Sequence, residues 1–364
     1  MSSTVAYLKP TNYCNVGCEH CYLSEAVRAD KNFMSDEKLR EVFEFIRSVR
    51  DKKGEKEAHI IWHGGEPLML APEWYENACA MAHEIFGDDG VSMSIQTSLI
   101  PFSPKWAKVF HKYFNSFIGT SIDFKSRKVR GSNEKYLELW MKRVTAARDE
   151  GLHVSPIMVP SRSELGHADK VIDWVMDNGF YVLNIDRFTI FKTKNIEWPT
   201  NSEHAQFLID MFEHCLKRLD EGKDAPYINA VVAGINGVFF GASGDRWGTT
   251  CQKSYIVIEP DGSLNACPDR TSVEDPFSNI SDGPDAFLRS KSRRNWIRVT
   301  DVTHKQSHCF VCRFNKFCKS GCPIMPNESK EQCSGYHKFL EHVEAYKNDP
   351  EKNLKVLKYL EHIG

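Results

Sequence analysis

The stretch Cys14-Asn15-Val16-Gly17-Cys18-Glu19-His20-Cys21-Tyr22 decides how the rest of the chain is interpreted. Its three cysteines are separated by three and then two residues, and they follow an apolar run, Val5 to Leu8, that predicts a first β-strand. Three thiolates on one loop can bind three corners of a cubane iron–sulfur cluster and leave one iron without a protein ligand. That iron is open to a small molecule, so the spacing indicates chemistry rather than simple electron transfer.

A structural zinc site is the alternative for this triplet. Zinc usually takes four ligands in a closed tetrahedron, often as two pairs of ligands. Here the triplet stands alone, and His20 is the nearby candidate for a fourth ligand. The spacing therefore favours the cluster over zinc.

Composition narrows the class of protein. A chain of 364 residues can bury a large core and is expected to form more than one domain. The net charge of -2 gives no reason to expect nucleic acid or an anionic membrane as partner, and neither a secretory signal nor a membrane-spanning run is visible. We therefore expect a cytoplasmic protein, in which twelve cysteines indicate metal binding rather than disulfides.

The first half of the sequence alternates between strands and helices. Each predicted strand but the last is followed by a clear helical period, which is typical of a parallel sheet with right-handed crossovers. Six units are too few for a closed eight-stranded barrel, so we predict an α/β fold with a partial (β/α)6 barrel. Ligands bind such sheets at the carboxyl ends of the strands, where the cysteine triplet lies. The predicted strands are residues 5–8, 58–62, 91–96, 117–122, 153–159 and 181–185.

The second half changes in character. Ser202 to Leu219 predicts a helix, and Tyr227 to Phe240 predicts another that is broken by Gly234 and Gly237. Short strands, turns and cysteines follow, including a hairpin formed by residues 255–259 and 263–266, and a polar helix at residues 337–363 closes the chain. The predicted parts are a barrel at residues 1–200, a helical bridge at 201–245, a cysteine-rich domain with the small hairpin at 246–336 and a C-terminal helix at 337–364.

The cysteine triplet resembles the signature of the radical S-adenosylmethionine (radical SAM) superfamily. The resemblance implies that the open iron binds the amino and carboxylate groups of SAM, and that a 5′-deoxyadenosyl radical then takes hydrogen from the substrate. His63-Gly64-Gly65-Glu66-Pro67, after the second strand, resembles the segment with which this family holds the amino group of SAM. A common glycine turn is the plain alternative for that segment.

Three more positions carry the same resemblance. Gln96-Thr97-Ser98 is similar to the family's segment near the substrate, and Ser121-Ile122-Asp123 to the segment that contacts the carboxylate and ribose of SAM. Tyr22 has the aromatic position beside the adenine. In isolation these residues would be read as a turn amide, a helix cap and a core aromatic. Together the resemblance implies a cofactor site made of Tyr22, Gly64, Gly65, Glu66, Gln96, Ser121 and Asp123.

Seven later cysteines follow in a characteristic order, with Gly262 five positions before the second of them: Cys251, Cys267, Cys309, Cys312, Cys318, Cys322 and Cys333. This order resembles the SPASM extension of radical SAM enzymes that modify peptides. The resemblance implies two auxiliary [4Fe–4S] clusters beside the SAM-binding one, three in all, and a pair of zinc knuckles is the alternative. The inner cluster has only three cysteines, so its fourth ligand is open. Cys79 and Cys215 lie in helical periods and are expected to be small buried residues. The outer set would be Cys309, Cys312, Cys318 and Cys333, and the inner set Cys251, Cys267 and Cys322, with Cys251 and Cys267 brought together by the hairpin.

The resemblance is weaker for the substrate. The motif around His63 is most like enzymes that modify ribosomally made peptides, and the chain is also similar to anaerobic sulfatase-maturing enzymes. Those carry an aspartate base directly after the cysteine matching Cys267, whereas here Pro268 intervenes and Asp269 is the candidate base. We expect a peptide or protein substrate and a flavodoxin- or ferredoxin-type reductant.

Two other functions remain open at this stage. Too few residues precede the first strand for a leader-binding domain, so a free amino acid or other small metabolite is an alternative substrate. A purely electron-carrying protein is the alternative from outside enzymology. It would gain nothing from an open cluster, and failure to form 5′-deoxyadenosine would identify it.

Overall fold

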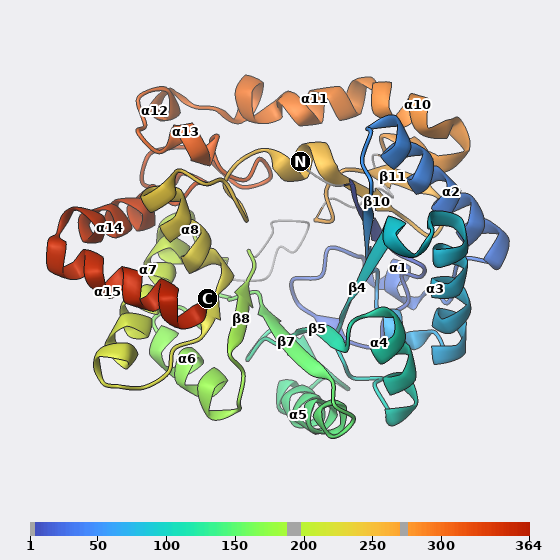
Figure 1. Ribbon diagram of the computed structural model, residues 1–364, viewed down its shortest axis with the longest axis horizontal. Coiled ribbons are helices and arrows are strands. Elements are labelled where there is room, and N and C mark those ends of the chain that lie inside the picture. The colour runs from blue at the N-terminus through green and yellow to red at the C-terminus, as the bar shows by residue number, and fades with distance from the viewer. Residues whose placement is uncertain (1–3, 188–197, 270–275) are drawn as a thin grey trace. The chain divides into compact units, whose positions relative to one another are not determined.

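The computed structural model describes residues 4–187, 198–269 and 276–364. The contacts between residues divide the chain into two compact units. Figure 1 labels the helices and strands by which both are described. The described part of the first unit lies within Met1–Ser155 and Thr250–Ile297. The second unit contains the remaining described residues up to Gly364.

A mainly parallel sheet forms the centre of the first unit. Its order is β12-β11-β10-β1-β3-β4-β5, and every pair from β10 to β5 is parallel, whereas β11 and β12 are antiparallel. Buried side chains alternate with partly exposed ones along β1, β3 and β4. The carboxyl ends of the parallel strands therefore share one edge, which gathers the loops that follow them. The strands are β1 (Thr4–Leu8), β3 (Ala58–Trp62), β4 (Val91–Thr97), β5 (Phe117–Ser121), β10 (Tyr255–Ile258), β11 (Ser263–Asn265) and β12 (Ser278–Asn279).

Helices of the first unit follow the strands in the predicted alternation. The Ser35 hydroxyl caps α2 by accepting a hydrogen bond from Lys38 N at 3.2 Å, and Ser132 caps α5 in the same way through Lys135 N. The apolar face of α2 packs on α3 and on the sheet. The helices are α1 (Glu25–Ala29), α2 (Asp36–Lys52), α3 (Pro72–Phe86), α4 (Ala107–Tyr113), α5 (Asn133–Asp149), α9 (Thr250–Ser254), α10 (Gly283–Arg289) and α11 (Lys291–Val299, whose last two residues belong to the second unit).

The second unit combines a short parallel sheet with a larger group of helices. The end of β7 (His153–Met158) pairs with β8 (Val182–Ile185), and β8 pairs with β9 (Tyr227–Ile228). Two short helices, α12 (Ser307–Phe310) and α13 (Asn315–Cys318), carry Cys309 and Cys318, and Cys312 lies in the short segment between them. The longer helices are α6 (Ala168–Asp177), α7 (Asn201–Asp220), α8 (Asn229–Phe240), α14 (His337–Asn348) and α15 (Pro350–Ile363).

The predicted α/β fold is confirmed. The six predicted strands are β1, β3, β4, β5, β7 and β8, and their ends differ from the prediction by one residue at most. The predicted hairpin is also present, as β10 and β11. No described helix has the length and apolar content that crossing a bilayer requires.

The predicted break in the helix at residues 227–240 is wrong. Tyr227 and Ile228 form β9, and α8 runs from Asn229 to Phe240 without interruption. A Cβ on Gly234 would lie 2.3 Å from a ring carbon of Phe339, and one on Gly237 would lie 2.5 Å from a ring carbon of Phe317. The glycines are there because aromatic rings pack directly on the helix backbone, not because the helix ends.

The predicted single C-terminal helix is also wrong, because α14 ends at Asn348 and α15 begins at Pro350. The Asp349 carboxylate accepts hydrogen bonds from Glu351 N at 3.0 Å and Lys352 N at 3.1 Å. Pro350 occupies the first helical position, where its missing N–H costs nothing. Asp349 and Pro350 thus start a new helix.

The hairpin is not part of a separate C-terminal body. Residues Val5 to Leu8 of β1 pair in parallel with Tyr255 to Ile258 of β10, so Thr250–Ile297 joins the first unit. The compact units therefore do not follow the predicted boundaries at residues 200 and 246.

Candidate functional site

Cys14, Cys18 and Cys21 lie together on the loop after β1, as the sequence predicts. Cys14 N donates to Arg28 O at 3.1 Å, and Cys21 N donates to Cys18 O at 3.3 Å. Burial is the main reason that the pKa of Cys14 rises to about 12 and that of Cys18 to about 11, and the neighbouring thiols raise both further. A bound iron ion carries positive charge, so it would stabilise the thiolate forms of Cys14 and Cys18 that burial disfavours.

A residue that the sequence analysis missed holds this loop in place. Strand β2 (Gly17–Cys18) pairs with β6 (Arg127–Lys128), and Cys18 stands opposite Arg127. Arg127 Nη1 donates to Cys18 Sγ at 3.2 Å, and Arg127 Nη2 lies 3.3 Å from His20 Nε2. The same guanidinium donates through Nε to the Asp123 carboxylate. Arg127 therefore connects the cysteine loop to the end of β5.

The Asp123–Arg127 pair is buried, with Asp123 0% and Arg127 9% exposed. Desolvation lowers the pKa of Arg127, but the charge of Asp123 and its hydrogen bond to the guanidinium raise it and keep it above its usual value. Arg127 is therefore protonated at neutral pH. One oxygen of the carboxylate predicted to contact SAM is already bound by Arg127, so the role of Asp123 as a ligand stays a proposal.

The predicted glycine segment packs against the cysteine loop. A Cβ on Gly64, whose φ is 127°, would lie 2.3 Å from Thr11 O, and one on Gly65 would lie 2.2 Å from Asn12 O. Gly65 N donates to Thr11 O at 3.0 Å, and Glu66 N donates to Tyr13 O at 2.8 Å. Only glycine permits this approach of two backbones.

The Glu66 side chain is 1% exposed and has four hydrogen-bond donors. Leu68 N donates at 2.9 Å and Thr97 Oγ1 at 2.5 Å to Oε1, while Ser98 N donates at 2.7 Å to Oε2, which also accepts from the Ser98 hydroxyl. Burial raises the pKa of Glu66, and these hydrogen bonds oppose the rise. The carboxylate thus connects the loop after β3 to the end of β4. Since its oxygens are occupied, the groups of this segment that could bind a ligand are its backbone carbonyls.

Tyr22 and His63 meet beside a second buried ion pair. Tyr22 Oη lies 3.5 Å from His63 Nδ1 and 3.4 Å from Gly64 O. Burial is the main cause that lowers the pKa of His63 to about 3, so this imidazole is neutral. Lys9 Nζ lies 4.6 Å from the Tyr22 ring centroid and 2.7 Å from Glu259 Oε1, with Lys9 and Glu259 0% and 1% exposed. The sequence analysis did not single out Lys9 or Glu259, which are 250 positions apart.

Gln96, Ser121 and Asp269 are the remaining predicted site residues of the first unit. Gln96 Nε2 donates to Ser121 Oγ at 2.9 Å, so the structure brings these two predicted residues together at the ends of β4 and β5. Asp269 is partly buried and follows β11 by a few residues. Its assignment as a base stays a proposal.

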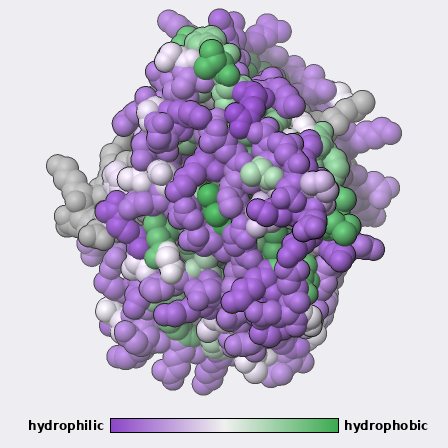
Figure 2. All heavy atoms as spheres, turned by 90° about the vertical axis from the view of Figure 1, so that its left-hand side faces the viewer, coloured by the Kyte–Doolittle hydropathy of each residue, from purple (hydrophilic) through white to green (hydrophobic). Residues whose placement is uncertain are grey.

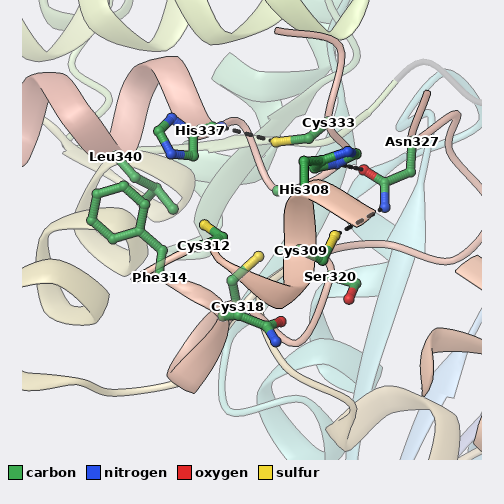
Figure 3. A pocket seen from close by; sticks show the side chains of 12 residues that line it. His308, Cys309, Cys312, Phe314, Cys318, Ser320, Asn327, Cys333, His337 and Leu340 are labelled. Carbon is green, nitrogen blue, oxygen red and sulfur yellow. Dashed lines mark hydrogen bonds between the residues drawn. The ribbon is translucent and has the colours of Figure 1, made fainter. Parts of the chain in front are cut away.

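Four cysteines of the predicted outer set line one pocket in the second unit. Figure 3 shows the sulfur atoms of Cys309, Cys312, Cys318 and Cys333 facing a common space. Burial, and then the charges of the other three thiols, keep the pKa of Cys318 above its usual value. Among the described residues no three His, Cys, Asp or Glu side chains gather closely enough to hold a single metal ion, and the four sulfurs surround a space instead.

Neighbouring groups donate to these sulfurs. Asn327 Nδ2 lies 3.5 Å from Cys309 Sγ, and His337 N donates to Cys333 Sγ at 3.2 Å. A Cβ on Gly335 would lie 2.4 Å from Cys318 Sγ. Four convergent thiols with N–H donors behind them fit the ligand set of a [4Fe–4S] cluster.

The inner set stays a prediction. Cys251 and Cys267 belong to the first unit and Cys322 to the second. Cys79 and Cys215 are 0% exposed on α3 and α7, which confirms that they are small core residues.

Comparisons with known proteins agree with this arrangement. The radical SAM superfamily matches residues 8–196. The serine-type anaerobic sulfatase-maturating enzyme of Klebsiella aerogenes is 22% identical over 91% of this chain and 83% of its own length. The structure of native anSMEcpe with bound AdoMet and Cp18Cys peptide is similar, with a TM-score of 0.78, 17% identity and 96% and 98% of the two chains covered.

A second solved structure is similar over less of its length. Streptococcus suis SuiB bound to precursor peptide SuiA has a TM-score of 0.59 and 15% identity, and the match covers 88% of this chain and 72% of SuiB. The two structural matches support the predicted fold, a radical SAM part followed by a SPASM part.

Proposed function

The chain belongs to the radical SAM superfamily of enzymes, and from this premise we propose that it oxidises a peptide or protein by abstracting a hydrogen atom from carbon. The observation that carries the proposal is the gathering of Cys14, Cys18 and Cys21 on one loop, docked against the glycine segment. Two structurally similar proteins, anSMEcpe and SuiB, hold peptides, which supports a peptide as substrate here.

We propose that Cys14, Cys18 and Cys21 hold a [4Fe–4S] cluster with one iron open to SAM. When both are bound, they supply an electron and a 5′-deoxyadenosyl radical that can take hydrogen from carbon. The protein's own task is then to position both partners and to keep water from the reacting carbon.

The residues around the loop suit that task. Because Glu66 is committed to the scaffold, we propose that the backbone carbonyls of Gly64 and Gly65 accept from an ammonium group. Gly64 O already accepts a hydrogen bond from Tyr22 Oη at 3.4 Å and has a second lone pair for the ligand. The Tyr22 ring is fixed by Lys9 on one side, which leaves an aromatic surface for an adenine. Gln96 and Ser121 form a hydrogen-bonded pair of the kind that can orient a ribose or a substrate amide.

Completing the oxidation requires removal of one further electron and one proton. We propose that Cys309, Cys312, Cys318 and Cys333 hold an outer auxiliary [4Fe–4S] cluster, and that Cys251, Cys267 and Cys322 hold an inner one. Asp269, two residues after a proposed ligand, would accept the proton. The outcome is a cross-link or an oxidised side chain.

The test begins with anaerobically reconstituted protein. We expect about twelve irons per chain, three cubanes of four, and formation of 5′-deoxyadenosine after reduction with dithionite in the presence of SAM. Replacing Cys14, Cys18 and Cys21 together by Ala should remove about a third of the iron and all SAM cleavage. Cys79→Ala is the matched control, because Cys79 is a buried cysteine outside the site, and it should keep both. SAM cleavage by the triple variant would refute the assignment.

Substrate class is tested by mass spectrometry. If a short precursor peptide is encoded beside this gene, it is the substrate to use, and a loss of two hydrogens from it would support a peptide substrate. Modification of free amino acids alone, with the peptide unchanged, would favour the small-metabolite alternative.

A further inference from the structure

An exposed apolar tip stands beside the outer cysteine pocket. Phe310 is 70% and Val311 is 88% exposed, and Val311 is the most exposed large hydrophobic side chain in the described part of the chain. Figure 2 shows a mainly hydrophilic surface on the side of the molecule that it presents, with hydrophobic residues in small groups. A pair of adjacent, almost fully exposed apolar residues gains nothing from folding, so their position calls for another reason.

The tip is placed directly between two of the proposed cluster ligands. Phe310 follows Cys309, and Val311 precedes Cys312, and both cysteines line the pocket in Figure 3. Consecutive Cα atoms are about 3.8 Å apart. A molecule seated on the tip is therefore separated from the ligands by little more than one residue, while Cys309 itself is only 5% exposed.

The stretch of sequence that contains the tip is basic. Residues 302–322 contain four Lys or Arg side chains and no Asp or Glu. Glu344 and Glu341 neutralise Arg313, but the other three cations form no ion pair within the described residues. Lys305 Nζ lies 4.7 Å from the Phe310 ring centroid. The three unpaired cations are Lys305, Lys316 and Lys319. In a chain of net charge -2, this segment is locally basic.

We propose that the Phe310–Val311 tip and its lysines dock an acidic one-electron carrier of the flavodoxin or ferredoxin type, which exchanges an electron with the outer cluster. The inference rests on the proposed function, because it needs a cluster at Cys309 and its partners. In the exchange the reduced cluster loses one electron and the oxidised carrier gains it, and no atom is transferred.

Size and charge select this occupant over a second copy of the chain. A stable dimer buries about 800 Å² on each partner, whereas electron-transfer complexes are at the small end of the range, below about 1,200 Å² in total. One phenylalanine and one valine with a basic surround fit the smaller class. The lysines favour an acidic partner, since opposite charges speed the encounter.

The experiment measures binding of oxidised flavodoxin, and separately of a [4Fe–4S] ferredoxin, to the reconstituted holoprotein by titration calorimetry. The wild type should bind at least one of them, and raising the salt from 50 to 200 mM should weaken binding several-fold, since surface charges are then screened. Phe310→Ser with Val311→Ser should weaken binding at least tenfold. The matched control is Leu354→Ser with Leu357→Ser on α15, two other exposed apolar residues (54% and 43%), which should leave binding unchanged.

Charge gives a second, independent variant. Lys305→Glu with Lys319→Glu should also weaken binding at least tenfold and remove most of the salt dependence. Equal binding by the wild type and both tip variants, or no binding of either carrier by the wild type, would overturn the proposal.

Two further readouts separate this proposal from the enzymatic one. Iron content of the tip variants should stay at that of the wild type, and dithionite-driven formation of 5′-deoxyadenosine should persist, because dithionite needs no docking surface. Loss of carrier binding with intact SAM cleavage supports the docking surface alone. Absence of SAM cleavage in the wild type would instead count against the proposed function. A tip variant that loses iron would show that these residues serve the cluster rather than a carrier, and would refute the proposal.

Discussion

Replacing Arg127 by Met removes one partner of a buried ion pair and so tests how the cysteine loop is held. Asp123, 0% exposed, would keep a carboxylate without its cation, and Cys18 Sγ would lose its donor at 3.2 Å. Breaking a buried pair in this way costs about 3–5 kcal/mol. For a folding unit of roughly 150–250 residues, each kcal/mol lowers the melting temperature by about 2–4 °C. Arg127→Met should therefore melt about 6–20 °C below the wild type.

The control lies on the same two-residue strand. Lys128 pairs with Glu19, but these side chains are 40% and 39% exposed. Such a surface pair contributes about 0–1 kcal/mol, so Lys128→Met should lower the melting temperature by no more than about 4 °C. Anaerobic differential scanning calorimetry of the reconstituted proteins measures both.

A double variant separates charge from packing. Arg127→Met with Asp123→Asn leaves no unpaired charge in the site, so it should recover part of the loss seen in Arg127→Met. Equal melting temperatures for Arg127→Met and Lys128→Met would refute the reasoning. So would a double variant that melts as low as, or lower than, the single one.

Three further predictions concern residues that pack near the proposed SAM-binding cluster and the proposed outer cluster. Lys9→Met leaves Glu259 buried without its cation, so it should lower the free energy of unfolding, measured by urea denaturation, by about 3–5 kcal/mol. The pKa of His63 is lowered to about 3 in the folded protein, whereas it is about 6.5 in the unfolded chain. Between these pH values the unfolded chain therefore binds a proton that the folded chain does not. Stability should therefore fall as pH drops from about 6.5 toward 3, and His63→Gln should flatten part of that fall in melting curves. Gly237→Ala places a Cβ 2.5 Å from the Phe317 ring and should cost about 1–3 kcal/mol and lower iron content, because Phe317 adjoins Cys318.

Each of the first and last of these has a matched control. Lys52 pairs with Asp285 on the surface, with side chains 42% and 58% exposed. Lys52→Met should change the free energy of unfolding by about 1 kcal/mol at most. No atom lies within 4 Å of a Cβ built on Gly244, so Gly244→Ala should keep both stability and iron. A loss of stability in Lys52→Met as large as in Lys9→Met would contradict the first, and full iron in Gly237→Ala with an unchanged midpoint would contradict the last.

The sequence predicts the alternation of strands and helices well because each element carries its own period and its own cap. The run Ala58 to Trp62 and the Ser35 cap are local signals, and both lie where they are expected. The sequence fails where a single residue type has two uses. Gly234 and Gly237 can end a helix or admit an aromatic ring, and only the packing of α13 and α14 on α8 decides between these.

Contacts between distant segments account for what was missed at the site. Arg127 reaches Cys18 across 109 positions through a pair of two-residue strands that have no period to detect. Lys9 meets Glu259 because β10 adds to the edge of β1, and nothing local in the hairpin indicates that it joins this sheet. A basic residue four positions after Asp123 is the one local signal, and it could have suggested the Asp123–Arg127 ion pair but not the contact with Cys18.

Glu66 lies after β3, where the sequence predicts it, and the structure adds what its carboxylate contacts. Both carboxylate oxygens are taken by donors from its own turn and from Thr97 and Ser98. A buried carboxylate without those donors would be destabilised by its full desolvation free energy. The hydrogen bonds are therefore kept, and they fix the distance between the ends of β3 and β4. Gly64 and Gly65, beside Glu66, are thereby held in close contact with the backbone of Thr11 and Asn12, which precedes the cysteine loop. The Glu66 carboxylate therefore fixes the position of the backbone of the glycine segment, and its own oxygens already have donors within the protein.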